Sequence, residues 1–202
     1  QDPKVYELFA KGKTEGIFQF ESSGMKEKLN LLKPTEFNDI VAMNALYRPG
    51  PMGQIEVYVR RKNKEEQVVY PHPHLEKILR DTYGVIVYQE QIMLIAVNFA
   101  HMSLNEADNM RRAVSKKKKE DLEYYGRIFV EKSVAAGYDL QVAKKLFDLI
   151  VTFANYGFNK SHAVVYSMLA YRLAYLKVYY TKHFMTALLN NVISSEKKIN
   201  EY

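Results

Sequence analysis

The fold is decided by residues 89–114, which read QEQIMLIAVNFAHMSLNEADNMRRAV. In the first half of this stretch, apolar residues recur at helical spacing: Ile92, Met93, Ala96 and Phe99. This spacing predicts a helix over residues 89–100. In the second half, Ser103 and Glu106 form a capping box, the sequence signature of a helix start. A second helix is therefore predicted to begin here and to run through Ala113.

Outward from this stretch, helical periodicity and helix-stop signals predict further helices on both sides. The predicted ranges are 5–10, 22–32, 37–46 (capped by Thr35), 74–80, 118–136, 140–153 (capped by Asp139), and one long helix from 161 to about 192. β-prone residues suggest at most one small hairpin, within residues 58–70. The apolar pentad 84–88 leads into the helix at 89. The predicted fold class is mainly α, and residues 1–202 are predicted to form one domain.

The composition is that of an ordinary globular chain, with 48% hydrophobic and 26% charged residues. There is no cysteine, which excludes disulfides, thiolate metal sites and cysteine nucleophiles. No apolar run approaches the about 20 residues that cross a bilayer, so no membrane partner is expected. The chain begins Gln1-Asp2-Pro3 rather than with Met, which suggests a piece of a longer protein.

Positive charge is concentrated immediately after the central helical stretch. The net charge is +6, and the basic residues of segment 111–119 are Arg111, Arg112, Lys116, Lys117, Lys118 and Lys119. Such a concentration attracts polyanions, meaning nucleic acid, nucleotides or anionic lipid. The alternative is a solvated, charged surface between helices, and charge alone favours neither.

The two arginines are candidates for binding phosphate. Leu104, Ala107, Met110 and Val114 form the predicted buried stripe. Arg112 points away from this stripe and Arg111 flanks it, so both guanidinium groups can face outward together. Forked donors beside a lysine run suit a triphosphate or a nucleic-acid backbone. The alternative is an ion pair within the helix, because Asp108 lies three and four residues before the arginines.

A second candidate site lies at residues 153–163, FANYGFNKSHA, where a loop with one glycine runs into the predicted long helix. Lys160, Ser161 and His162 lie at the start of that helix, where free backbone N–H groups favour anions. The alternative gives Asn159 or Ser161 a capping role and leaves His162 as a surface residue. No two aspartates are separated by a single residue, so the chain encodes no two-metal catalytic centre.

Six motifs together resemble a known family. They are GIFQFES (16–22), ALYRPGPM (45–52), YGVIVYQEQIM (83–93), Ala107-Asp108 with MRRA (110–113), the lysines 116–118, and YGFNKSHA (156–163). In this order they resemble the fingers region of the C-family replicative polymerases, the alpha subunits of bacterial DNA polymerase III. The family often has a glycine between the arginine pair and the lysine run, where this chain has Ser115.

The resemblance implies a helical fingers domain that binds the incoming deoxynucleoside triphosphate and the nascent template-primer base pair during DNA-directed DNA synthesis. By this similarity, the nucleotide-binding residues are Arg111, Arg112, Lys116, Lys117, Lys118, Asn159, Lys160, Ser161 and His162. Arg48, in the Arg-Pro-Gly-Pro turn, is implied to contact phosphate near the palm junction.

The resemblance also implies that catalysis belongs elsewhere. The family's metal-binding aspartates lie in a preceding palm domain, so this chain has no catalytic residue and no metal site, and alone it is expected to be inactive. Mg²⁺ would be bound outside it. Implied partners are primer-template DNA, deoxynucleoside triphosphate, the palm domain and other replicase subunits, in the cytoplasm. The alternative function is a stand-alone basic helical module that binds nucleic acid without catalysis.

Overall fold

The structure, a computed structural model, describes residues 1–116, 118–154 and 156–202. The chain divides into two compact units. The terminal unit combines residues 1–47 with 161–202, and the central unit is residues 48–160. Two compact units of one chain can still unfold together. The division therefore does not test the prediction that residues 1–202 form one domain, which stays a prediction.

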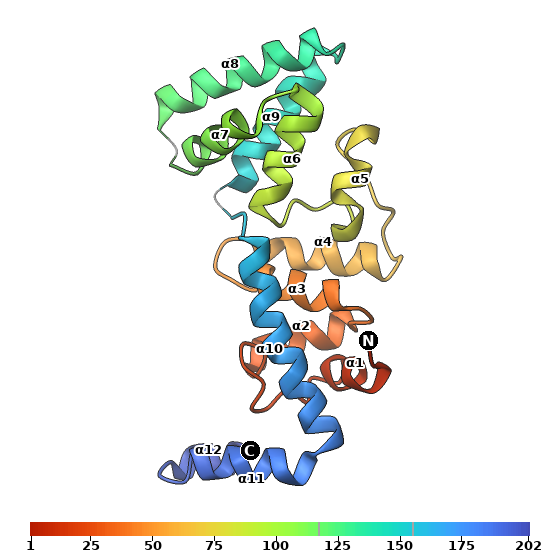
Figure 1. The fold of residues 1–202 in the computed structure, drawn as a ribbon. Helices are drawn as coiled ribbons and strands as arrows, with labels where there is room; N and C mark the ends of the chain where they lie inside the picture. Colours follow the sequence, from red (N-terminus) through yellow and green to blue (C-terminus); the bar gives the residue numbers. More distant parts are fainter. Residues whose placement is uncertain (117, 155) are drawn as a thin grey trace. The chain divides into compact units, whose positions relative to one another are not determined.

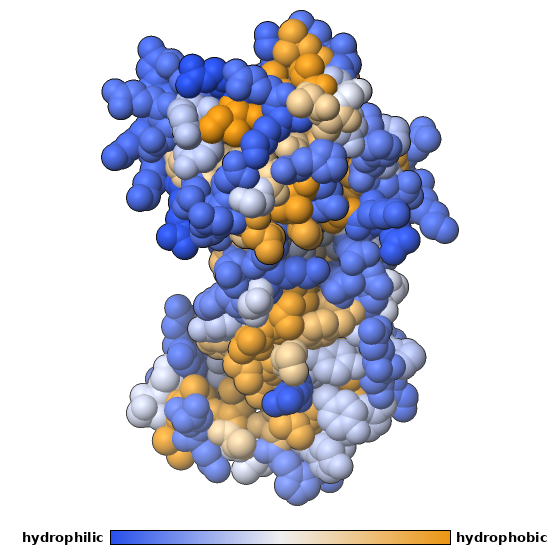
Figure 2. Space-filling model, turned by 45° about the horizontal axis from the view of Figure 1, so that its top comes forward, coloured by the Kyte–Doolittle hydropathy of each residue, from blue (hydrophilic) through white to orange (hydrophobic). Residues whose placement is uncertain are grey.

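The prediction of a mainly α fold is confirmed. In the described residues every regular element is helical, and the only β-type pairing is an isolated bridge between Tyr88 and Phe158. No described helix is long and apolar enough to cross a membrane. On the face drawn in Figure 2, hydrophobic surface lies in separate patches with hydrophilic surface between them.

The terminal unit is built around one long helix (Figure 1). Its helices are α1 (Pro3–Ala10), α2 (Ser23–Leu32), α3 (Phe37–Leu46), α10 (Lys160–Tyr179), α11 (Thr181–Asn191) and α12 (Glu196–Glu201). α10 packs on the others through small and aromatic residues: the Asn44 amide of α3 lies 3.4 Å from the Ser167 hydroxyl of α10, and the rings of Tyr6 and Tyr171 lie 5.6 Å apart. The N-cap of α3 is Glu36 rather than the predicted Thr35.

The central unit has its own hydrophobic core. Its helices are α4 (Gly53–Lys62), η1 (Pro73–Leu75), α5 (Glu76–Leu79), η2 (Arg80–Thr82), α6 (Gln89–Ala100), α7 (Leu104–Lys116), α8 (Lys119–Ala135) and α9 (Leu140–Ala154). α6, α7, α8 and α9 surround fully buried residues such as Phe99, Met110, Phe129 and Ile150. The predicted stripe on α7 is confirmed except at Leu104, which is 68% exposed.

The hairpin that the sequence allowed within residues 58–70 does not form. Residues 58–62 belong to α4, where Ile55, Tyr58 and Val59 are buried together at the i, i+3, i+4 spacing of a helix face. Residues 63–70 follow as turns and irregular chain without a strand, so the absence of a hairpin agrees with the mainly α fold class.

The predicted single helix from 161 to about 192 is also wrong, because the chain bends at Tyr180 between α10 and α11. The Thr181 hydroxyl donates to the carbonyl oxygen of Lys177 at 2.7 Å. The bend places Leu188 of α11 directly against Gly16 within the same unit.

Candidate functional site

Two of the sequence motifs pair with each other at the start of α6. The backbone N–H of Gln89 donates to the Phe158 carbonyl at 3.0 Å, and the Phe158 N–H donates to the Val87 carbonyl at 3.0 Å. The buried Gln91 side chain supports this junction, because its Oε1 accepts from the N–H groups of Val87 and Tyr88 at 2.8 and 3.0 Å. A buried amide with its bonds made holds the backbone in one conformation. We call segments 87–89 and 156–160 the paired segments.

Arg48 binds to the paired segments from the Arg-Pro-Gly-Pro turn. Its Nη2 donates to the Tyr156 carbonyl at 2.6 Å, and its guanidinium lies 4.4 Å from the centre of the Phe158 ring. Burial lowers the pKa of Arg48 from its usual value, but an arginine remains charged. Gly50 of the same turn, at φ +105°, lies so close to Tyr156 that a Cβ atom would overlap the ring.

Lys160 joins the paired segments through its backbone and its ammonium group. Its N–H donates to both carboxylate oxygens of Glu90, at 3.1 and 3.0 Å, and its Nζ lies 5.3 Å from the centre of the Tyr88 ring. At Lys160, therefore, the predicted anion site at the start of α10 is already occupied by a carboxylate of the chain.

The neighbours of Lys160 in the second motif are exposed. Asn159, Ser161 and His162 are all accessible to solvent, and the His162 ring stacks on Tyr166 at 4.2 Å. Asn159 belongs to the central unit, whereas Ser161 and His162 belong to the terminal unit. The N–H of Lys160 is taken by Glu90, and the capping role of Asn159 or Ser161 stays a prediction.

Asp108 holds both arginines of α7. Arg111 donates to its Oδ1 through Nε at 3.0 Å and Nη2 at 2.7 Å, and Arg112 reaches its Oδ2 through Nη2 at 2.8 Å. The hydrogen bond from Arg111, together with both positive charges, holds the pKa of Asp108 below its usual value. The ion pair that the sequence left open as an alternative is thus present for both arginines.

The two arginines differ in exposure and in their further contacts. The Arg111 side chain is only 19% exposed, and its Nη1 donates to Gln89 Oε1 at 3.1 Å. The prediction that both guanidinium groups face outward is therefore wrong for Arg111, because Gln89 draws it toward the paired segments. The Arg112 side chain is 65% exposed and does face solvent.

The lysines lie where α7 ends and α8 begins. Lys116 ends α7 and Lys118 is the N-cap of α8, and both are exposed. Lys117 lies outside the described residues. The Ser115 hydroxyl donates to the carbonyls of Arg111 at 2.8 Å and Ala154 at 3.2 Å, which ties the end of α7 to the end of α9.

Within the central unit, cations from three separate motifs thus meet at one place. Arg48, Arg111 and Lys160 all contact the paired segments or the residue beside them. Among the described residues there is no group of three or more histidine or acidic side chains placed to ligate a metal.

Sequence reasoning missed the residues that organise this cluster. Gln89 and Glu90 hold Arg111 and the Lys160 backbone, and Gln91 fixes the junction itself. The available signal was the run of polar residues Tyr88-Gln89-Glu90-Gln91 at the start of a helix. Capping of α6 explains the hydrogen bonds of Gln91, but not those that Gln89 and Glu90 make with Arg111 and Lys160.

The comparisons with known proteins agree with the motifs. The model of the family described as the bacterial DNA polymerase III alpha subunit finger domain matches residues 1–137. The chain belongs to this family. The DNA polymerase III subunit alpha of Bacillus subtilis (strain 168) is 56% identical over 201 residues, which cover 100% of this chain and 18% of the relative.

Two further relatives lead to the same finger-domain family. The DNA polymerase III subunit alpha of Halalkalibacterium halodurans is 56% identical over 198 residues, and that of Staphylococcus aureus (strain N315) is 52% identical over 197 residues. In each case the match covers 98% of this chain and 18% of the relative. The resemblance read from the six motifs is confirmed, and the chain spans about a fifth of the length of these relatives.

Proposed function

We propose that this chain, as a finger domain of a longer polymerase, binds the triphosphate of the incoming deoxynucleotide and contacts the nascent template-primer base pair. The observation that supports this most directly is the convergence of Arg48, Arg111 and Lys160 on the paired segments. Fixed cations around a rigid junction suit a ligand that carries several negative charges in a defined geometry.

Within the proposed site, the two arginines have different roles. Arg112 is exposed and held by a single carboxylate oxygen, so a triphosphate, which carries more negative charge, can replace Asp108 as its partner. Arg111 has three hydrogen bonds and little exposure, which suits a positioning residue. Lys116, Lys117 and Lys118 would raise the local concentration of the nucleotide and of DNA.

The second motif would complete the site. We propose that Asn159, Lys160, Ser161 and His162, which follow one another in the chain, line the nucleotide or the template strand. Arg48 would contact phosphate close to the junction with the palm. No residue of this chain is proposed to be catalytic.

In the proposed reaction, the 3′-hydroxyl oxygen of the primer attacks the α-phosphate of the nucleotide. The hydroxyl gives up its proton as its oxygen bonds to the α-phosphorus. The bond between the α-phosphorus and the oxygen that bridges to the β-phosphorus breaks, and pyrophosphate leaves. The cations of this chain would hold the β- and γ-phosphates and neutralise the charge that grows on the leaving group. Mg²⁺, when bound to acidic residues outside this chain, would supply charge neutralisation and activation of the hydroxyl.

The proposal has consequences for the isolated chain and its surroundings. Alone, it is expected to be inactive, because the acidic residues that bind metal would belong to a palm domain. Its partners would be primer-template DNA, deoxynucleoside triphosphate, the palm and other replicase subunits in the bacterial cytoplasm.

The test is single-nucleotide incorporation by the full-length polymerase carrying Arg112→Ala. Because losing one well-placed donor to a developing charge costs about 10²-fold in rate, we expect kcat/KM to fall by about that factor. The matched control is Arg80→Ala, since Arg80 is a 73% exposed arginine of the same unit paired with Asp81. The control is expected to keep wild-type kinetics, and wild-type kinetics for Arg112→Ala would remove Arg112 from the site.

A further inference from the structure

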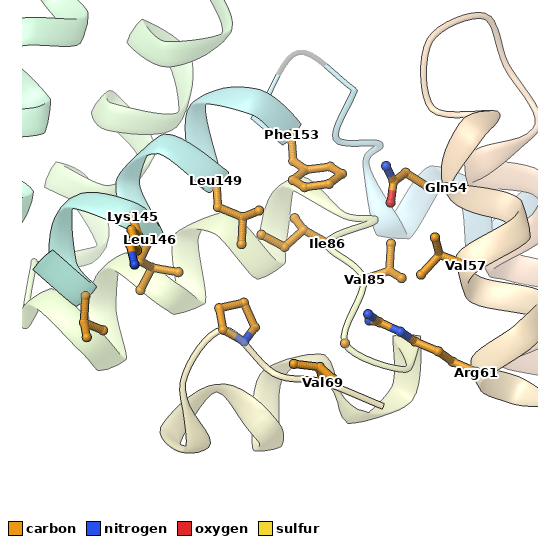
Figure 3. A pocket seen from close by; sticks show the side chains of 13 residues that line it. Gln54, Val57, Arg61, Val69, Val85, Ile86, Lys145, Leu146, Leu149 and Phe153 are labelled. Carbon is orange, nitrogen blue, oxygen red and sulfur yellow. The ribbon is translucent and has the colours of Figure 1, made fainter. Parts of the chain in front are cut away.

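A cavity of about 630 Å³ lies in the central unit, beside the segment that leads into α6 (Figure 3). Its walls come from α4, from α9 and from the segments around residues 69–71 and 84–86. The volume falls inside the range of about 300–1,000 Å³ that is typical of small-molecule sites. Of the residues proposed above to bind the nucleotide, none that the structure describes lines it.

The walls of the cavity are mostly apolar. The residues that give it this character are Val57, Val69, Val85, Ile86, Leu146, Leu149 and Phe153. The Phe153 ring and the Leu149 side chain project from α9 toward the opposite wall formed by α4 and the 84–86 segment (Figure 3). Such walls select a ligand with an apolar body, because burial of apolar surface contributes roughly 25 cal/mol per Å².

The polar groups of the cavity are an amide and two cations, and no acidic residue lines it. Gln54 and Arg61 project from α4 (Figure 3), and Lys145 lines the cavity from α9. Arg61 is already engaged, with Nε 2.9 Å from Glu66 Oε1 and Nη1 donating to the Tyr83 carbonyl at 3.1 Å. Lys145 is exposed, which leaves its ammonium group able to meet a ligand.

We propose that this cavity is a binding site for a small amphipathic anion, meaning an apolar, preferably aromatic body with one carboxylate, sulfonate or phosphate group. The apolar body occupies the space between Leu149, Phe153 and Val85. The anionic group pairs with Lys145, and Arg61 supplies additional positive potential. The proposal is independent of the nucleotide-binding function, because it rests on a different set of side chains.

The test is photolabelling of the full-length polymerase with 5-azidonaphthalene-1-sulfonate, an aromatic anion, followed by peptide mapping. Its neutral counterpart, 1-azidonaphthalene, has the same apolar body without the charge. We expect saturable labelling by the sulfonate within residues 54–61, 69–86 and 142–153. In Lys145→Glu, half-saturation by the sulfonate should shift by about tenfold or more, whereas labelling by the neutral compound should change by less than about twofold.

The matched control is Lys144→Glu, which makes the same change of charge one residue away. Lys144 is exposed but lines a different surface depression, with Glu123 and Glu131, and not this cavity. It is expected to leave the labelling by both compounds unchanged. The proposal is overturned by labelling outside the cavity, by equal effects of the two lysine variants, or by equal labelling with the charged and neutral compounds. Since none of these readouts uses nucleotide incorporation, failure here is separate from failure of the proposed function.

Discussion

At the residue scale, Gly50 shows why a turn in the chain has to carry a particular amino acid. Its φ of +105° lies in a region that residues with a Cβ atom rarely adopt, and an added Cβ would lie 2.3 Å from Tyr156 Cε1. The turn therefore brings the backbone of one motif against the aromatic ring of another. The sequence predicts a tight, stiff turn here, but only the structure identifies Tyr156 as its contact.

We expect Gly50→Ala to destabilise the chain by about 1–3 kcal/mol, because the backbone is strained and the Tyr156 ring has to move. Urea denaturation followed by circular dichroism measures this change. The matched control is Gly53→Ala, because Gly53 has no positive φ and no atom within 4 Å of the position of an added Cβ. Equal stability of the two variants would show that the contact with Tyr156 has no energetic weight.

Residue types and spacing identified the basic side chains, but not which way each would turn. The helical periodicity of α7 places Arg111 at the flank of the buried stripe, where either direction is allowed. The choice is made by Gln89, which lies 22 residues earlier and accepts from Arg111 at 3.1 Å. Such a partner from another helix is invisible to a pattern read within one helix. The Asp108 pairs, in contrast, follow from i, i+3 and i, i+4 spacing alone.

At the scale of elements, α7 begins as its sequence predicts. The Ser103 N–H donates to Glu106 Oε2 at 2.8 Å, and the Glu106 N–H donates to Ser103 Oγ at 3.2 Å. Lys132 of α8 adds a contact of 2.7 Å to Glu106 Oε1. These bonds, that of Lys132 foremost, lower the pKa of Glu106 to about 2.

We expect Ser103→Ala to destabilise the chain by about 1 kcal/mol, because the Glu106 N–H loses its acceptor at the start of α7. Denaturation in urea gives the measurement. The matched control is Ser195→Ala, since Ser195 is the N-cap of α12 but its side chain makes no capping hydrogen bond. A loss of stability as large in the control would mean that the capping box of α7 contributes nothing specific.

The same box predicts a pH dependence. Because the pKa of Glu106 is lower in the folded chain than its unfolded value of about 4.3, its stabilisation is complete above that pH and is lost as the pH falls toward about 2. The pair is exposed, so the effect is expected to stay below about 1 kcal/mol. In Glu106→Gln this part of the acid dependence should disappear, and an unchanged profile between pH 4.5 and 2.5 would contradict the assignment.

Helices were predicted well where a local sequence signal marks their start or end. They were predicted poorly where tertiary packing determines their ends. α6, α8 and α9 begin within a residue of their predicted starts. The hairpin that β-prone residues allowed does not form, because residues 58–62 continue a helix face that is buried on one side. The prediction of one long helix failed because Tyr180 and Thr181 are not a stop signal in the sequence. The bend instead accompanies a tertiary contact, the packing of Leu188 on Gly16, which no local pattern reveals.

At the scale of the whole molecule, the boundaries of the two compact units could not be predicted from the sequence. Composition, linkers and repeats gave no boundary, because the chain enters the central unit at Arg48 and leaves it at Lys160 within continuous motifs. The central unit is nevertheless one uninterrupted segment with a core of its own, whereas the terminal unit is assembled from both ends of the chain.

We therefore expect a fragment of residues 48–160 to fold alone and to unfold in one cooperative transition, measured by thermal circular dichroism. Its core is made by its own residues, including Phe99, Phe129 and Ile150, all fully buried. As a control, Phe99→Ala, which removes a ring stacked 3.7 Å from Tyr138, should destabilise the fragment by about 3–5 kcal/mol if the transition reports this core. A fragment that melts without cooperativity, while the complete chain melts in a single step, would instead favour one domain over residues 1–202, since the central core would then depend on the rest of the chain to fold.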